Sequence, residues 1–202
     1  MIIQGLKLKT KNNPNIFIVS TDIGEFVLHS DMIVKFGIAI GEVDESIFDN
    51  AVKNSAELIA FNTCMKYISS KVKTEHQIRD YLYKKEFKKT VVDNVISKLK
   101  EYKIIDDKMY AEMYIRSNVK FSKNKIKQKL YSFGVKNDMI EDVVTIVDDK
   151  ESCELNASKF MKNKQNTKEN IDKLVRRLTY LGYNWDTIKS IINKYRREDG
   201  WD

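Results

Sequence analysis

The sequence predicts a mainly α-helical protein: three tandem three-helix repeats that form an elongated, curved rod, preceded by a small N-terminal antiparallel β-sheet. Three observations predict this fold. A unit of about 48 residues recurs three times, helix-capping residue types recur with it, and the first 50 residues differ in composition from the rest. Repeats that bury their inner faces locally stack on their neighbours and build extended arrays.

Residues 1–50 carry the pattern of the sheet. Four lysines stand against seven acidic residues there, a net charge of −3, whereas the remainder of the chain carries +10. Apolar and β-branched residues dominate residues 1–30, with turn-forming residues at 12–15 and 21–24. We therefore expect a small antiparallel sheet over residues 1–30.

A helical pattern follows the predicted sheet. A short helix is expected after Asp31 and should end at Gly41, because glycine interrupts helices. The pattern resumes near Asp44 and continues to about Lys71. The chain has a single proline, Pro14, so nothing opposes long helices beyond this region.

Each repeat contains five apolar positions that recur at the same spacing. Two lie four residues apart in one predicted helix and two lie four residues apart in the next, so each pair lines one helix face. The fifth lies between the two helices. The five columns are Ile78, Ile126 and Leu174; Leu82, Leu130 and Leu178; Phe87, Val135 and Tyr183; Val92, Ile140 and Ile188; and Ile96, Val144 and Ile192.

The first helix of each pair should stop four residues after its second apolar column. Gly134 and Gly182 hold this place in the second and third repeats, and Glu86 holds it in the first. A residue in the left-handed conformation ends a helix there, and glycine adopts it without the steric cost that Glu86 meets. The apolar residue that follows should pack on the leucine five positions before it.

Polar residues of the N-cap type recur with the apolar columns. Their side-chain oxygens can accept from unpaired amides, so we expect a helix to start at each of them. The two columns are Thr74, Ser122 and Asn170, and Thr90, Asp138 and Asp186.

A further helix precedes each pair, marked by a small, then an aromatic, then an aliphatic residue. The members are Cys64, Tyr67 and Ile68; Ala111, Tyr114 and Ile115; and Ala157, Phe160 and Met161. Each repeat therefore has three helices. We expect a sheet-containing N-terminal region over residues 1–50 and helical repeats over residues 51–105, 106–149 and 150–202.

Composition and motifs exclude several classes of protein. Hydrophobic residues make up 42% and charged residues 32% of the chain, which is typical of a globular protein. We find no phosphate-binding glycine motif, no cysteine–histidine cluster and no apolar run that could span a membrane. We therefore expect a cytoplasmic protein that is not an enzyme, has no cofactor or metal, and keeps Cys64 and Cys153 as reduced thiols.

Two pairs of neighbouring aspartates, Asp106-Asp107 and Asp148-Asp149, could suggest a metal site. Each pair lies at a predicted helix start, where carboxylates accept from backbone amides and favour the positive end of the helix dipole. We therefore interpret both pairs as helix caps.

The basic residues favour a polyanion or an acidic protein groove as partner. Residues 70–130 contain 17 lysines and arginines against 8 acidic residues, and residues 122–136 contain five lysines and no acid. A solvated helix face is the common alternative for any one lysine, but the protein as a whole carries +7. No motif that reads bases accompanies this charge. The lysines of the acid-free stripe are Lys123, Lys125, Lys127 and Lys129.

Several segments recur in one order and at one spacing along the chain. They are Tyr67–Arg79 with Leu82; Lys85–Phe87; Leu99–Asp107; Tyr110, Ala111 and Tyr114–Arg116; Ile126–Leu130 with Gly134 and Val135; and Leu174–Leu178 with Leu181–Tyr183. In this order and spacing they resemble the RecX family of RecA regulators over essentially the whole chain. Two departures from the family pattern are Ser122, where glycine is frequent, and Lys71 with Lys73, where arginine is frequent; lysine keeps the charge but lacks the planar fork.

The resemblance implies a monomeric regulatory protein that binds along the groove of RecA filaments on single-stranded DNA. It further implies inhibition of ATP hydrolysis, filament growth and strand exchange in recombination and the SOS response, with direct DNA contact left open. The residues alone also allow a basic helical-repeat protein that binds DNA or RNA directly. The expected partner-binding residues are Lys71, Lys73, Arg79, Arg116, Lys123, Lys125, Lys127, Lys129, Arg176 and Arg177.

Overall fold

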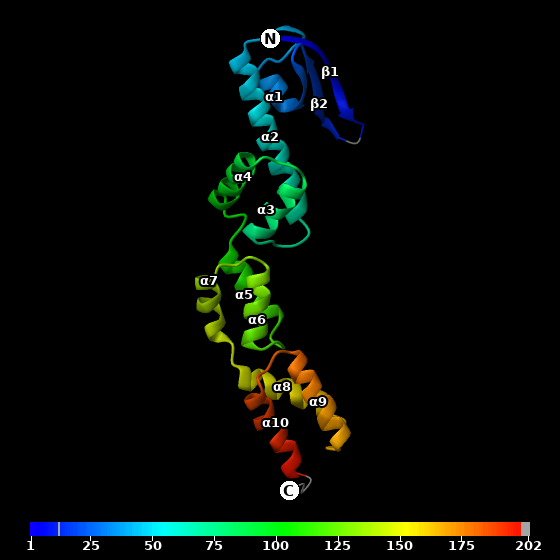
Figure 1. Cartoon of the computed structure of the whole chain (residues 1–202), viewed down its shortest axis with the longest axis vertical. Coiled ribbons are helices and arrows are strands. Elements are labelled where there is room, and N and C mark those ends of the chain that lie inside the picture. Colours follow the sequence, from blue (N-terminus) through cyan, green and yellow to red (C-terminus); the bar gives the residue numbers. More distant parts are fainter. Residues whose placement is uncertain (12, 199–202) are drawn as a thin grey trace. The chain divides into compact units, whose positions relative to one another are not determined.

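The structure is a computed structural model that describes residues 1–11 and 13–198 (Figure 1). It divides into two compact units. The first unit contains Met1–Lys73 and Gln77–Ile105, and the second contains Thr74–His76 and the chain from Asp106 onward. No helix in the described part of the chain is both long and apolar enough to cross a membrane.

The first unit begins with a four-stranded sheet. Its strands are β1 (Ile2–Thr10), β2 (Asn13–Thr21), β3 (Gly24–His29) and β4 (Gly41–Glu42), in the order β3-β2-β1-β4. All neighbouring strands are antiparallel. The sheet predicted over residues 1–30 is therefore confirmed, and the short strand β4 extends it at the β1 edge.

Two helices cover this sheet. Helix α1 (Ser30–Lys35) is shorter than predicted, because Gly41 does not end a helix but opens strand β4. Helix α2 (Glu45–Ile68) follows the predicted span, and the Asp44 carboxylate caps it by accepting from the amides of Ser46 and Ile47. The core between sheet and helices contains Ile3, Val19, Leu28, Ile38, Phe48 and Ala51.

The rest of the first unit contains the first helical repeat apart from residues 74–76, which belong to the second unit. The C-terminal half of α2 packs with α3 (Glu75–Lys84) and α4 (Lys89–Glu101) around one core. Ala60 and Cys64 of α2 are fully buried in it, because small side chains let α2 approach the other two helices closely.

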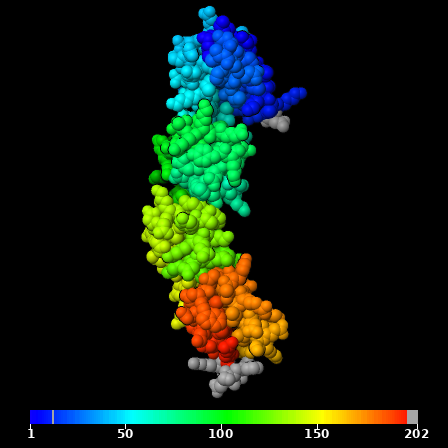
Figure 2. Space-filling model, in the orientation of Figure 1, coloured from blue at the N-terminus to red at the C-terminus, as the bar shows by residue number. Residues whose placement is uncertain are grey.

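The second unit holds six further α-helices within the described residues, in two sets with separate cores. The first set is α5 (Asp107–Ser117), α6 (Lys123–Ser132) and α7 (Asn137–Val143), which continues into the short 3₁₀ helix Val144–Ile146. The second set is α8 (Asp149–Met161), α9 (Lys168–Tyr180) and α10 (Trp185–Glu198). Figure 2 shows atoms of the first set (yellow-green) in contact with atoms of the second (orange).

The recurring apolar columns form these cores, as predicted. Every member is buried except Phe87, which is half-buried. The predicted helix stops are also confirmed. Glu86, Gly134 and Gly182 all have positive φ, at 63°, 77° and 92°. The residue after each stop donates its amide hydrogen to the carbonyl of the leucine five positions earlier, at 3.1–3.2 Å.

Glu86 is the strained member of this column. Replacing it by glycine is expected to raise the free energy of unfolding by about 0.5–1 kcal/mol, because relief of the left-handed strain exceeds the added chain entropy of glycine. Urea denaturation would measure the change. Lys84→Gly is the matched control, because Lys84 lies in the last turn of α3, where glycine should destabilise by a similar amount.

The predicted helix starts are only partly correct. Ser122 caps α6, but Asn170 lies inside α9, which begins at Lys168 under a cap from Thr167. The column of Thr90, Asp138 and Asp186 also lies within helices, two residues after their N-caps; the caps are Lys88, Lys136 and Asn184. The starts predicted from this column are therefore two residues too late. Lys88 and Lys136 cannot accept from an amide and so do not mark the starts of α4 and α7 in the sequence, whereas Asn184 accepts from the Thr187 amide at 2.8 Å.

Candidate basic interaction surfaces

Helix α6, which carries the lysine stripe, is fixed at its N-terminus by the end of α9. Ser122 accepts the amide hydrogen of Lys125 at 3.1 Å, and its hydroxyl donates to the carbonyl of Gly182 at 2.6 Å. The amide of Ser122 donates to the carbonyl of Leu181 at 3.0 Å. A Cβ on Gly182 would lie 2.7 Å from the Ser122 hydroxyl oxygen, so this contact requires glycine as well as its positive φ.

The two aspartate pairs are helix caps, as predicted, but their members act on different helices. Asp106 and Asp148 accept from amides in the first turns of their own helices, α5 and α8. The second members reach a helix start elsewhere in the second unit: Asp149 accepts from the Lys123 amide at 2.6 Å and Asp107 from the Glu75 amide at 2.9 Å. The pair Asp148-Asp149 therefore ties the starts of α8 and α6 together within the second unit.

Arg79 and Lys127 occupy the same position in successive repeats and make the same internal ion pair. Arg79 of α3 contacts Asp93 of α4 at 2.5 Å, and Lys127 of α6 contacts Glu141 of α7 at 2.6 Å. Asp93 and Glu141 are also equivalent positions. Both predicted partner-binding side chains are therefore paired within their own repeat. The lysine stripe contains no acidic residue along the chain, but Glu141 of the neighbouring helix lies beside it.

Lys125 and Lys129 lie on the opposite flank of α6 from Lys127, since residues two apart on a helix point about 200° apart. Lys125 donates to the Tyr180 carbonyl at 3.1 Å, and its ammonium lies 5.0 Å from the centre of the Tyr180 ring. Lys129 is exposed. Lys123, at the start of the helix, is half-buried.

Arg176 and Arg177 are exposed on α9. The Arg177 guanidinium lies 5.8 Å from the centre of the Phe160 ring of α8, and the Lys164 ammonium lies 3.2 Å from the same ring. Arg116 on α5 is 76% exposed in its side chain and only loosely paired with Glu112, at 3.9 Å. The charged groups of Arg116, Arg176 and Arg177 are therefore exposed to solvent and could contact a partner.

In the first unit, Lys73 of the predicted residues lies beside a pair of stacked rings. Tyr67 and Tyr81 are parallel, with centroids 4.0 Å apart and planes at 9°. Lys73 lies 4.8 Å from the Tyr67 ring centre, and Lys85 lies 5.8 Å from that of Tyr81. Lys71 is exposed in the loop after α2. Cations over half-exposed rings are favourable and leave both groups accessible.

Sequence reasoning missed Lys85 and Lys164 as members of these basic–aromatic groups. The signal was present in the repeat columns: Tyr67 and Phe160 are equivalent aromatic positions, and the residues that face them, Tyr81 and Arg177, are also equivalent. The same helix geometry thus places an aromatic ring beside cations in the first and third repeats. In the second repeat, Tyr114 instead packs edge-on against Phe133, at 5.5 Å between ring centres.

The two thiols contribute to packing. Cys64 and Cys153 are free and buried, and loss of hydration raises the pKa of each thiol to about 11. A thiol with such a pKa is a poor nucleophile and a poor metal ligand at neutral pH, because the thiolate is the reactive form.

Two family models match this chain in its helical part. One, described as the first three-helix domain of RecX, matches residues 60–99, and the other, the second three-helix domain of RecX, matches residues 106–144. The chain is 29% identical over 204 residues to the regulatory protein RecX of Clostridium tetani, with 96% of this chain and 94% of that protein covered. The chain resembles the RecX family over nearly its whole length.

Further relatives extend over the full chain. The regulatory protein RecX of Clostridioides difficile is 25% identical over 210 residues, with 100% of this chain and 99% of that protein covered. A crystal structure of a regulatory protein RecX shares the fold, with a TM-score of 0.64, 21% identity and coverage of 95% and 98% of the two chains. The first RecX domain thus corresponds to the end of α2 with α3 and α4, and the second to α5, α6 and α7.

Proposed function

We propose that this protein binds the RecA filament on single-stranded DNA and inhibits its ATPase, its growth and its strand exchange. The resemblance to the RecX family over nearly the whole chain is the observation that carries this proposal, since the relatives are named as regulatory proteins RecX. The protein acts in the cytoplasm as a monomer, without a catalytic activity of its own.

The candidate binding surface consists of basic side chains on both units. We assign the main contacts to Lys71, Lys73, Lys125, Lys129, Arg176 and Arg177, which form no ion pair within residues 1–11 and 13–198. Lys123 and Arg116 contribute contacts at the edge of this surface. Arg79 and Lys127 contribute less, because each is held by a carboxylate of its own repeat. Many exposed contacts of about 0.2–1 kcal/mol each would together provide the affinity.

A long filament groove suits an extended partner. We propose that the segments 51–105, 106–149 and 150–202 stack as a curved rod behind the N-terminal region 1–50. Small-angle scattering would then give a radius of gyration well above the value of about 17 Å for a compact globule of this length. A value near 17 Å would rule out the rod.

The functional test is the ATPase of RecA on single-stranded DNA at increasing concentrations of this protein. Inhibition well below the concentration that binds bare DNA is the expected result. An unchanged ATPase rate under conditions in which RecA filaments form would contradict the proposal.

Direct binding to DNA or RNA is the second candidate function, favoured by the cations beside exposed rings, an arrangement on which bases can stack. Titration with single-stranded DNA alone across a salt series separates the two. A steep loss of affinity with salt and no need for RecA would support direct binding as the main function.

A further inference from the structure

A second candidate site lies in the first unit, beside the sheet. A pocket of about 330 Å³ opens between the strands β2 and β3 and the C-terminal half of α2. This volume lies within the range of small-molecule sites. Polar side chains form most of its wall, and Ile16, Ile59 and Met65 form the rest; the polar members are Asn13, Asn15, His29, Asn62, Thr63 and Lys66.

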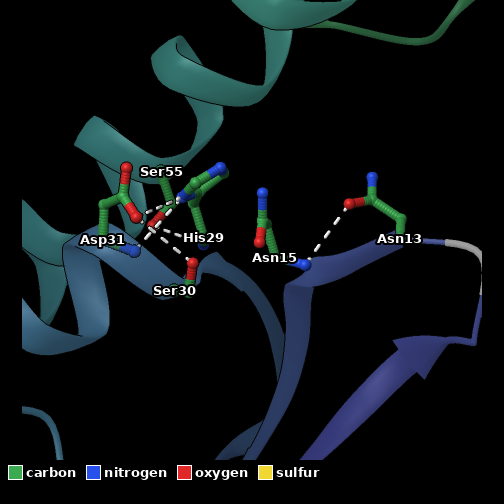
Figure 3. A network of polar contacts seen from close by, with 6 residues as sticks. All are labelled: Asn13, Asn15, His29, Ser30, Asp31 and Ser55. Atoms are coloured by element: carbon green, nitrogen blue, oxygen red, sulfur yellow. Dashed lines mark hydrogen bonds and ion pairs between the residues drawn. The ribbon is translucent and has the colours of Figure 1, made fainter.

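His29 is the buried group of this pocket, with only 4% of its surface exposed. Its backbone amide donates to the Ser55 hydroxyl at 3.0 Å, and its Nδ1 accepts the amide hydrogen of Asp31 at 3.2 Å as the cap of α1. Because Nδ1 accepts, the proton of the neutral ring lies on Nε2. In Figure 3 the Nε2 edge turns away from Asp31, toward the side where Asn15 and Asn13 lie.

The Nε2–H donor has no partner within the described residues, and His29 is one of the residues that line the pocket. Most of the His29 side chain is buried, but no side-chain nitrogen or oxygen in the described part of the chain is both fully buried and without a hydrogen-bond partner, so Nε2 remains accessible from the pocket. The hydrogen bond from the Asp31 amide to Nδ1 holds the imidazole in place, so the Nε2–H donor is oriented before any ligand arrives. The Asp31 carboxylate lies on the opposite edge of the ring, 3.6 Å from Nδ1.

The charge in the pocket favours an anion. None of its lining residues is acidic, and Lys66 supplies a full positive charge from the wall formed by α2. The Asn13 side-chain oxygen accepts from the Asn15 amide at 3.4 Å, which leaves the Asn13 NH₂ group as a donor. The lining of the pocket therefore offers an imidazole N–H, an ammonium and amide NH₂ groups as donors, and Asp31, the carboxylate beside His29, lies at the Nδ1 edge of the ring and not among the lining residues.

We propose that this pocket binds a phosphate group, free or as a small phosphomonoester. His29 and Lys66 contact the phosphate oxygens, the asparagine amides complete its shell, and Ile16 and Ile59 line the space for an organic substituent. The inference does not depend on the RecA proposal, because all of these residues belong to the sheet and α2.

The chain has two histidines, His29 and His76, so their ring signals in an NMR spectrum report directly on the site and on an exposed control. Titration of the full chain with sodium phosphate at fixed pH, against sodium chloride of matched ionic strength, should shift the His29 signal saturably and leave His76 unchanged. Acetate should bind at least about tenfold more weakly, because a monoanion with two oxygens uses fewer of the donors. The nucleotide dAMP tests the phosphomonoester form of the ligand.

Three variants sharpen the test. Lys66→Met should weaken phosphate binding about tenfold or more through loss of a charge-assisted hydrogen bond. Lys53→Met, on an exposed position of the same helix outside the pocket, should leave the affinity within about twofold. His29→Asn retains a cap for α1 but removes the Nε2–H donor. Because this variant lacks the reporting ring, its phosphate affinity is measured by isothermal titration calorimetry beside that of the unchanged protein, and it should be at least about tenfold weaker.

A His29 shift that is linear and equal in phosphate and chloride would overturn the proposal, as would equal binding of acetate. Unchanged affinity in Lys66→Met would do the same, and that exposed substitution does not threaten folding. No RecA enters this experiment, so its failure and a failure of the filament proposal remain separate results.

Discussion

Replacing Leu130 by alanine is expected to lower the free energy of unfolding by about 2–5 kcal/mol. Leu130 is fully buried in the core of α5, α6 and α7, and its carbonyl accepts the Val135 amide at the helix stop. Alanine would retain that hydrogen bond but lose the buried methyl groups and leave a cavity among neighbours that relax only in part. Urea denaturation followed by circular dichroism would measure the loss.

Lys129→Ala is the matched control for this prediction, because it changes the adjacent residue of the same helix. The Lys129 side chain is exposed, so its removal should change stability by less than about 0.5 kcal/mol. Similar losses in both variants would mean that α6 does not present Leu130 to the core.

Simultaneous reversal of Lys125, Lys129 and Arg177 to glutamate is expected to abolish inhibition of the RecA ATPase. Each reversal removes an attraction to the filament and adds a repulsion. The loss of binding free energy from three reversals is then larger than the remaining weak contacts can compensate. The free energy of unfolding should fall by no more than about 1–2 kcal/mol, because these side chains lie outside the cores and Lys125 gives up its hydrogen bond to the Tyr180 carbonyl. Inhibition would be measured over a concentration series, with folding checked by thermal denaturation.

The control for this variant carries the same change in net charge at other exposed lysines of the second unit, Lys136, Lys159 and Lys189. It should inhibit RecA at the concentration that the unchanged protein requires. Equal loss of inhibition in both triple variants would show that net charge alone matters. Full inhibition by the first variant would remove these residues from the proposed surface.

The helical core was predictable because apolar spacing and helix-stop chemistry are local properties of the chain. Leu82, Leu130 and Leu178 face inward for the same reason in each repeat, and the left-handed stop follows them even where Glu86 replaces glycine. The start of α9 was not predictable from the period, because Thr167 offers an earlier cap than Asn170 and adds nearly a turn to the helix. Strand β4 was missed because a two-residue strand has no pattern of its own.

The charge of the candidate surfaces was harder to predict, because it depends on which helices meet. The stripe around Lys127 contains no acid along the chain, yet Glu141 of the next helix reaches it. A signal was available in the sequence: Arg79 with Asp93 and Lys127 with Glu141 share the same separation and the same place in the repeat. The cations beside Tyr67 and Phe160 depend on side-chain packing across helices, which periodicity alone does not provide.

The two buried thiols also allow local unfolding to be followed by thiol labelling, without introducing a probe. At pH 7 a thiol with a pKa of about 11 is ionised in only about one molecule in ten thousand, and burial blocks reagents as well. Labelling must therefore await an opening of the surrounding helices, and its rate measures how often that opening occurs. Cys64 lies in a core of the first unit and Cys153 in a core of the second. Mass spectrometry of a single labelling reaction would therefore measure the rate of local opening in each unit separately.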